Sequence, residues 1–336
     1  MSNFATRCLI TILSLIAIVS APIGALTLKI ASIAPQATPW GAALDKMAVD
    51  LARISGGELE IKVFHGGIAG DESDILRKLK IGQLQGAVFT NLGLNMISPE
   101  ALTLSVPLLI TGEDELDYIL AKDRDFMQKK LEDKGFVVLA WSKAGWVHFF
   151  SKKPVSSPED LKKMKMATTP SDLSLAQAFK TLGYNLIPVP LSEILVALSS
   201  GMVEASYQSP LIAGATQLFG IAKNMTDFSI SPFVGAIVLS QHAWSRMSPD
   251  TRTKVQDYAR SIEKGLNADI IKLEGDAIKA MQGYGLVINK TTPQQLEAWK
   301  KDFDASLPAT IGTSFDKDFY EMVSAQLAEF RTARKK

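Results

Sequence analysis

Two kinds of hydrophobic pattern alternate along the chain after its first 25 residues. The run Leu28–Ala31, with one polar residue, is typical of a buried strand. A second strand is predicted where Leu59, Ile61 and Val63 alternate with charged residues. Between the two, apolar residues recur at spacings of four and three and predict an amphipathic helix ended by Gly56-Gly57. They are Trp40, Leu44, Met47, Leu51 and Ile54.

The same alternation continues through the first half of the chain. The pattern predicts helices at about 72–82 and 113–134 and strands at 86–90 and 136–141. Strands and helices that alternate in this way are typical of an α/β domain with a largely parallel sheet.

The second half carries clear helix signals. Ser157-Pro158-Glu159-Asp160 combines an N-cap, a proline at the first helical position and an acid three residues after the cap, which predicts a short helix. A further helix is predicted from Ser171 to Leu182, and a strand from Leu186 to Val189. An apolar stripe over 251–281 predicts one long helix or a broken pair, which could brace two domains.

A faint internal repeat links two parts of the chain. Ile75-Leu76-x-x-Leu79-x-x-Gly82 recurs as Ile194-Leu195-x-x-Leu198-x-x-Gly201, and each copy runs into a strand that ends on a hydroxyl or an amide. Ligands of open α/β sheets bind beyond the carboxyl ends of the strands. The repeat therefore predicts two α/β units whose strand ends face each other across a cleft. The alternative is a chance match between two ordinary helices that end at glycine.

Composition and charge narrow the class of protein. A chain of 336 residues with 47% hydrophobic and 21% charged residues is globular and long enough for two domains. Its net charge of +1 gives no basic field that would attract nucleic acid.

The N-terminus has the order of a secretory signal. Arg7 precedes an apolar run from Cys8 to Val19, and small residues follow up to Ala25. We expect cleavage after Ala25, removal of Cys8 with the signal, and a soluble mature protein in the periplasm. The apolar run is short for the ~20 residues of a membrane helix. An uncleaved anchor is the alternative.

Catalytic chemistry is scarce. The chain has three histidines, His65, His148 and His242, and no motif of a metalloprotease, an α/β-hydrolase or a phosphate loop. Asp71, Glu72 and Asp74 form one acidic cluster. A helix start explains them better than a metal site, because acids favour the positive end of the helix dipole, although Glu72 could also face the cleft. We predict neither an enzyme nor a cofactor; a secreted hydrolase that uses His148 and a carboxylate is the alternative.

Several segments in series resemble the solute-binding proteins of TRAP transporters, the tripartite ATP-independent periplasmic family of DctP type. The segments are Leu28–Ala31 with Ala34-Pro35 and Pro39-Trp40-Gly41, Ser55-Gly56-Gly57, Gly66-Gly67-x-x-Gly70-Asp71-Glu72, Ile81-Gly82-Gln83-Leu84, Gly135–Trp141, and Pro158-Glu159-Asp160-Leu161-Lys162. They stand in the expected order over about residues 27–290.

The resemblance implies a two-domain, class II-like α/β periplasmic binding protein with central mixed sheets, hinge strands and a long helix across both domains. We expect a signal peptide at 1–25, domain I at 26–144 and about 234–270, domain II at 145–233 and about 271–305, and a C-terminal helical segment at 306–336. It also implies that a closed, ligand-bound form is presented to the small and large permease subunits in the membrane.

Typical members of the family hold a substrate carboxylate with two arginines, and this sequence departs from that pattern. The corresponding positions are Val147 and Ala167, and no arginine occurs between Arg124 and Arg246. Lys143 and Lys165 could supply only point charges. Each hydrogen bond to a charged group contributes about 1.5–3 kcal/mol, so an organic-acid receptor would lose much affinity here.

The sequence therefore predicts a largely apolar or neutral ligand in the cleft, a class that includes lipid-like molecules. The candidate ligand-binding residues are Trp40, Glu72, Thr90, Asn91, Trp146, Val147, Ala167, Tyr207, Gln208 and Phe233. The departure resembles the TRAP subgroup whose receptor works with a periplasmic tetratricopeptide-repeat protein, which makes such a protein a candidate partner. A carboxylate receptor of the same family and a secreted protein that carries hydrophobic cargo are the alternatives.

Overall fold

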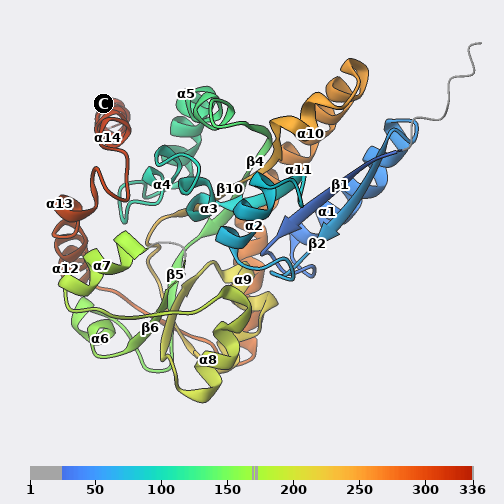
Figure 1. Ribbon diagram of the computed structural model, residues 1–336. Helices are drawn as coiled ribbons and strands as arrows, with labels where there is room; N and C mark the ends of the chain where they lie inside the picture. The colour runs from blue at the N-terminus through green and yellow to red at the C-terminus, as the bar shows by residue number, and fades with distance from the viewer. Residues whose placement is uncertain (1–24, 169, 171–172, 335–336) are drawn as a thin grey trace, which may run out of the picture.

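The computed structural model describes residues 25–168, 170 and 173–334, and two β-sheets organise it (Figure 1). The first sheet has the order β2-β1-β3-β10-β4. Its strands are β1 (Leu26–Ser32), β2 (Leu59–Phe64), β3 (Gly86–Thr90), β4 (Phe136–Trp146) and β10 (Pro232–Ser240). Strand β1 pairs in parallel with β2 and β3, whereas β10 is antiparallel to both β3 and β4. The sheet is thus mixed, and the expectation of a largely parallel sheet holds only for its β2-β1-β3 part.

The second sheet has the order β11-β9-β5-β8-β6-β7. Its strands are β5 (His148–Ser151), β6 (Lys165–Thr168), β7 (Asn185–Pro188), β8 (Ala205–Gln208), β9 (Asn224–Thr226) and β11 (Val287–Asn289). We call the two sheets, each with its helices, the first and the second lobe. The chain crosses from the first lobe to the second between β4 and β5, and back between β9 and β10.

Helices cover both sheets. The longer ones are α1 (Pro39–Ile54), α2 (Glu72–Lys80), α5 (Glu113–Glu132), α7 (Leu173–Thr181), α11 (Pro249–Gly283), α12 (Pro293–Asp304) and α14 (Lys317–Ala333). The shorter ones are α3 (Asn91–Asn95), α4 (Glu100–Thr103), α6 (Pro158–Lys162), α8 (Ile194–Ser200), α9 (Pro210–Ala215), α10 (Gln241–Ser245) and α13 (Leu307–Thr310). Helix α6 starts with the predicted capping box of Ser157 and Asp160. The predicted start of α7 at Ser171 lies outside the described residues.

The internal repeat corresponds to two similarly built units. Gly82 and Gly201 end α2 and α8 with φ of 75° and 77°, a left-handed conformation that glycine adopts without steric cost. Strand β3 then lies between parallel β1 and antiparallel β10, and β8 lies between parallel β6 and antiparallel β5. The repeated sequence thus marks the same position in each lobe.

Helix α11 is continuous over 35 residues and contacts α1 and β4 of the first lobe and α9 of the second. Its side chains accept from peptide N–H groups on the outer edge of β4: Glu263 Oε2 from Trp141 (3.0 Å), Asn267 Oδ1 from Lys143 (2.9 Å) and Glu274 Oε1 from Trp146 (2.8 Å). These bonds satisfy donors that an edge strand leaves unpaired, and they fix α11 beside the segment that crosses between the lobes.

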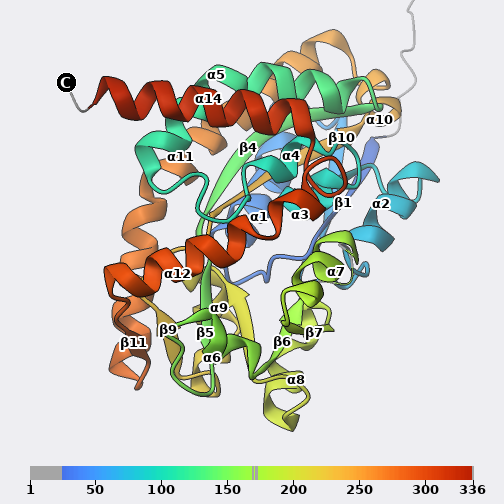
Figure 2. The same cartoon turned by 90° about the vertical axis from the view of Figure 1, so that its left-hand side faces the viewer.

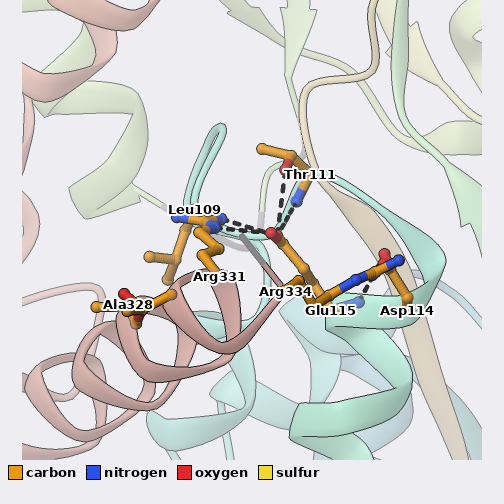
Figure 3. A network of polar contacts seen from close by, with 8 residues as sticks. Leu109, Thr111, Asp114, Glu115, Ala328, Arg331 and Arg334 are labelled. Carbon is orange, nitrogen blue, oxygen red and sulfur yellow. Dashed lines mark hydrogen bonds and ion pairs between the residues drawn. The ribbon is translucent and has the colours of Figure 1, made fainter. Parts of the chain in front are cut away.

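The C-terminal part of the chain returns from the second lobe to the first. Trp299 of α12 stacks on Phe149 of β5, with ring centroids 5.2 Å apart, whereas α14 lies on α4 and α5 (Figure 2). Arg331 of α14 forms a bidentate ion pair with Glu115 of α5, with Nε–Oε1 and Nη2–Oε2 both at 2.7 Å. It also donates to the Leu109 carbonyl (Figure 3). Residues 305–316 therefore link one lobe to the other.

Candidate functional site

A cavity of about 440 Å³ is lined by residues of both lobes. Eight of the ten predicted site residues line it: Glu72, Thr90, Asn91, Val147, Ala167, Tyr207, Gln208 and Phe233. Thr90 and Gln208 are the last residues of the repeated strands β3 and β8, so the cavity lies beyond the carboxyl ends of strands in both sheets. Its volume is within the range of about 300–1,000 Å³ that small-molecule sites occupy.

Glu72 is placed in this cavity by the start of α2, where Asp71 caps the helix by accepting from the Asp74 N–H. Its carboxylate accepts from the Thr90 N–H (2.6 Å) and the Thr90 hydroxyl (2.8 Å). Burial raises the pKa of Glu72 to about 7, although hydrogen bonds from Thr90 and Gly93 oppose this shift. Glu72 therefore holds the end of β3 in place and is only partly ionised near neutral pH.

The polar groups that face the cavity are few and partly committed to each other. Asn91 Nδ2 donates to the Ser105 hydroxyl, and Gln208 Nε2 donates to the Ser206 hydroxyl at 3.3 Å. Thr90 and Ser209 cap the helices that follow β3 and β8 with their side-chain oxygens. These groups can orient a ligand by single hydrogen bonds, and the rest of the wall is mainly apolar.

Val147 and Ala167, the two positions that the resemblance matched to the family's arginines, both line the cavity and are buried. None of the described residues that line the cavity is arginine, lysine or histidine. Lys143 bridges Glu113 and Asp117 and lies outside the lining, as does the exposed Lys165. The two lysines considered as substitutes therefore do not contact this space.

The carboxyl groups of the lining belong to Asp71, Glu72, Asp74 and Glu193, of which Glu72 is only partly ionised near neutral pH. Asp74 pairs with Arg77 at 2.9 Å on the exposed side of α2. Glu193 is exposed on the second lobe. The local field of these carboxylates disfavours an anionic ligand.

The structure places Trp40 and Trp146 outside the lining of this cavity. The Trp40 indole N–H donates to Ser142 (2.9 Å), and its ring packs against Ile212 and Ile270. The Trp146 indole N–H donates to Glu113 of α5 (2.7 Å). Each indole finds its partner in the first lobe, so we remove both tryptophans from the candidate site.

Sequence reasoning missed four aromatic residues of the lining. They are Phe179 of α7, Tyr184 just before β7, Phe303 of α12 and Phe315 in the segment before α14, and they line the cavity together with Phe149 of β5. Phe303 and Phe315 lie in the C-terminal part of the chain, to which the sequence assigned no ligand contact. The five-residue spacing of Phe179 and Tyr184 carried no periodic signal either.

Other chemistry does not converge on the cavity. His148 is buried, its Nδ1 lies 3.0 Å from the Thr226 carbonyl, and burial lowers its pKa. Among the described residues, no group of three or more His, Cys, Asp or Glu side chains could hold a metal ion. In the same part of the chain, no helix is both long and apolar enough to cross a membrane.

The chain is similar to known proteins at the level of the family, of single relatives and of solved structures. The family described as bacterial extracellular solute-binding protein, family 7 (DctP), matches residues 30–311. The 2,3-diketo-L-gulonate-binding periplasmic protein YiaO of Escherichia coli is 28% identical over 198 residues, which is 58% of this chain and 60% of that protein.

Two solved TRAP periplasmic solute-binding proteins show the shared fold. The protein from Ralstonia eutropha with bound (S)-2-acetolactate has a TM-score of 0.83 at 22% identity, covering 90% of this chain and 99% of the other. The protein from Sulfurospirillum deleyianum with bound succinate has a TM-score of 0.81 at 24% identity, with the same coverage.

Proposed function

The chain belongs to family 7 of the bacterial extracellular solute-binding proteins, and from this premise we propose that it is the TRAP receptor for a largely apolar or neutral solute. The solute binds between the lobes, and closure of the lobes presents the complex to the membrane permease. Proteins of this family are solute-binding receptors and not enzymes. For this chain we place the mature protein in the periplasm, after loss of residues 1–25.

The observation that carries the ligand class is the absence of any cation among the described residues that line the cavity. A buried carboxylate without a charged or multiple hydrogen-bonding partner is costly. Two lost charge-assisted bonds, at about 1.5–3 kcal/mol each, correspond to roughly two to four decades of affinity. An apolar solute bears none of this cost and gains from the aromatic and aliphatic walls.

A carboxylate receptor is the second candidate. The two similar solved proteins hold succinate and (S)-2-acetolactate, and YiaO is a 2,3-diketo-L-gulonate-binding protein. Neutral donors could then replace the arginines. Thr90, Asn91 and Gln208 all lie on the cavity wall. The two candidates predict opposite orders of affinity for anionic and neutral probes.

The test uses purified protein after removal of residues 1–25. We expect the neutral fluorescent probe N-phenyl-1-naphthylamine to bind saturably, and succinate and galacturonate at millimolar concentration to leave its signal unchanged. Val147→Arg should reduce probe affinity, because it brings a cation into the apolar wall. Val49→Arg, on an exposed face of α1, is the matched control for added charge. Tight binding of either acid to the wild-type protein would refute the proposal.

The partners follow from the family and from the departure at the two arginine positions. We propose that the receptor works with the small and large TRAP permease subunits and with a periplasmic tetratricopeptide-repeat protein. Co-purification of the repeat protein with the receptor, from cells that express both, tests the second partner. The domain limits given above, with crossings near residues 144 and 234, remain predictions that limited proteolysis can test.

A further inference from the structure

The C-terminal strap, which we define as residues 303–316, reaches the ligand cavity as well as connecting the lobes. Phe303 belongs to the apolar core of the second lobe and Phe315 to an apolar cluster of the first lobe. Both line the same cavity as Thr90 and Gln208. The strap thus contributes two aromatic side chains to the site, one packed in each lobe.

One wall beside the strap is aromatic. The Phe179 ring lies edge-on to Phe303, with centroids 6.1 Å apart, and edge-on to Tyr184 at 5.5 Å. The Tyr184 hydroxyl is already committed to Asp302, at 2.6 Å. These three side chains therefore present ring carbons to the cavity, because the one polar side-chain atom among them, the Tyr184 hydroxyl, is hydrogen-bonded to Asp302.

A second part of the lining is apolar and buried. Phe315 packs with Leu102 of α4, and both line the cavity. Phe303 and Phe315 are each 2% exposed and Leu102 is 1% exposed. Hydrogen bonds within residues 310–315 fold the strap back on itself, and α13 contacts α7. The strap thus lines the cavity with buried apolar side chains, whereas Glu193, also in the lining, is exposed to water.

We infer that the strap forms an apolar end chamber of the site, which holds the hydrocarbon tail of an uncharged single-chain amphiphile and sets the longest tail that fits. The inference rests on the proposed function and names its substrate class. The polar head then lies toward Thr90, Asn91 and Gln208. At ~30 Å³ per water-sized group, the 440 Å³ cavity holds about 15 heavy atoms.

The test is displacement of N-phenyl-1-naphthylamine by straight-chain primary alcohols from hexanol to hexadecanol, a series that passes the estimated capacity of the cavity. Affinity should rise about fourfold for each methylene added, as burial of one methylene predicts. It should then fall at the length at which the tail meets the strap. Phe315→Ala should move this limit to longer alcohols, and Phe315→Leu, a milder change, should move it in the same direction.

Phe319→Ala is the matched control. Phe319 is equally buried and follows on α14, but it packs against Phe126 and does not line the cavity. It should lower stability and leave the length limit unchanged. If wild type binds the probe and the alcohols but the Phe315 variants keep the wild-type limit, the end chamber is refuted and the proposed function stands. If wild type binds neither probe nor alcohol, the proposed function itself fails.

Discussion

Gly145 lies near the end of β4, three residues before β5 begins, and its replacement tests how the crossing segment is held. Its φ is +87°, and a Cβ added there would overlap the carboxylate of Glu274 on α11. That carboxylate accepts from the Trp146 N–H at 2.8 Å and is 7% exposed. Gly145→Ala must therefore strain the backbone and also displace Glu274 from a buried donor.

The magnitude follows from these two effects. A left-handed non-glycine residue costs roughly 1–2 kcal/mol. A buried N–H that loses its acceptor costs about 1–3 kcal/mol more. Gly135→Ala is the matched control, because Gly135 has φ +86° and nothing within 4 Å of the added Cβ. We expect Gly145→Ala to destabilise by about 2–5 kcal/mol and Gly135→Ala by about 1–2 kcal/mol.

The assay is urea unfolding followed by far-UV circular dichroism, with the free energies compared at constant m-value. In a Glu274→Ala background the overlap is gone, so Gly145→Ala should then cost no more than Gly135→Ala does in wild type. Equal costs of the two glycine substitutions in the wild-type background would refute the reasoning, because only one of them meets the Glu274 carboxylate.

Three further predictions concern charge. Burial raises the pKa of Glu72 to about 7, so the native state binds this proton more strongly than the unfolded state does. The resulting stabilisation of the native state is complete below pH ~4.5 and is lost as the pH rises through about 7. Glu72→Gln should therefore lessen the fall in the free energy of unfolding between pH 5 and pH 8 by up to about 3 kcal/mol; parallel wild-type and variant curves would contradict this. Arg331→Ala should lower the free energy of unfolding by about 1–2 kcal/mol in the same urea assay, a value reduced by the partial exposure of this arginine. Arg334→Ala removes a more exposed ion pair and should cost less. The reverse order would contradict a stabilising role of the Arg331–Glu115 ion pair. Ala167→Arg should weaken the naphthylamine probe at least tenfold and allow succinate to bind, measured by calorimetry; unchanged probe affinity would show that Ala167 is not on the ligand surface.

Local signals in the sequence were sufficient for most single elements. The capping box at Ser157 and the left-handed Gly201 each act within one turn of the chain. Their pattern therefore predicts the start of α6 and the end of α8 directly. The antiparallel placement of β10 was not predicted. It depends on where the chain returns after leaving the second lobe, and no residue of 232–240 encodes the strand it pairs with.

The sequence indicated the cavity lining where a residue ends a repeated strand, and it did not where a side chain depends on a distant partner. Thr90 and Gln208 end β3 and β8, so their position follows from topology alone. Trp146 stands near a strand end too, but Glu113 lies 33 positions earlier in the sequence and accepts its indole N–H. Phe315 was missed because its contribution requires the strap to cross between the lobes, which no local pattern indicates.

In the proposed receptor, selectivity against anions comes from the lack of a cationic side chain among the described lining residues more than from the hydrogen-bond donors that are present. The hydroxyls and amides of Thr90, Asn91 and Gln208 can serve a neutral head and a carboxylate alike, so they do not distinguish the two ligands. An anion must in addition leave water without a compensating cation, near rim carboxylates that repel it. An uncharged tail avoids both costs and gains with every methylene that reaches the aromatic wall. If the proposed function holds, we therefore expect this cavity to rank solutes by charge first and by chain length second.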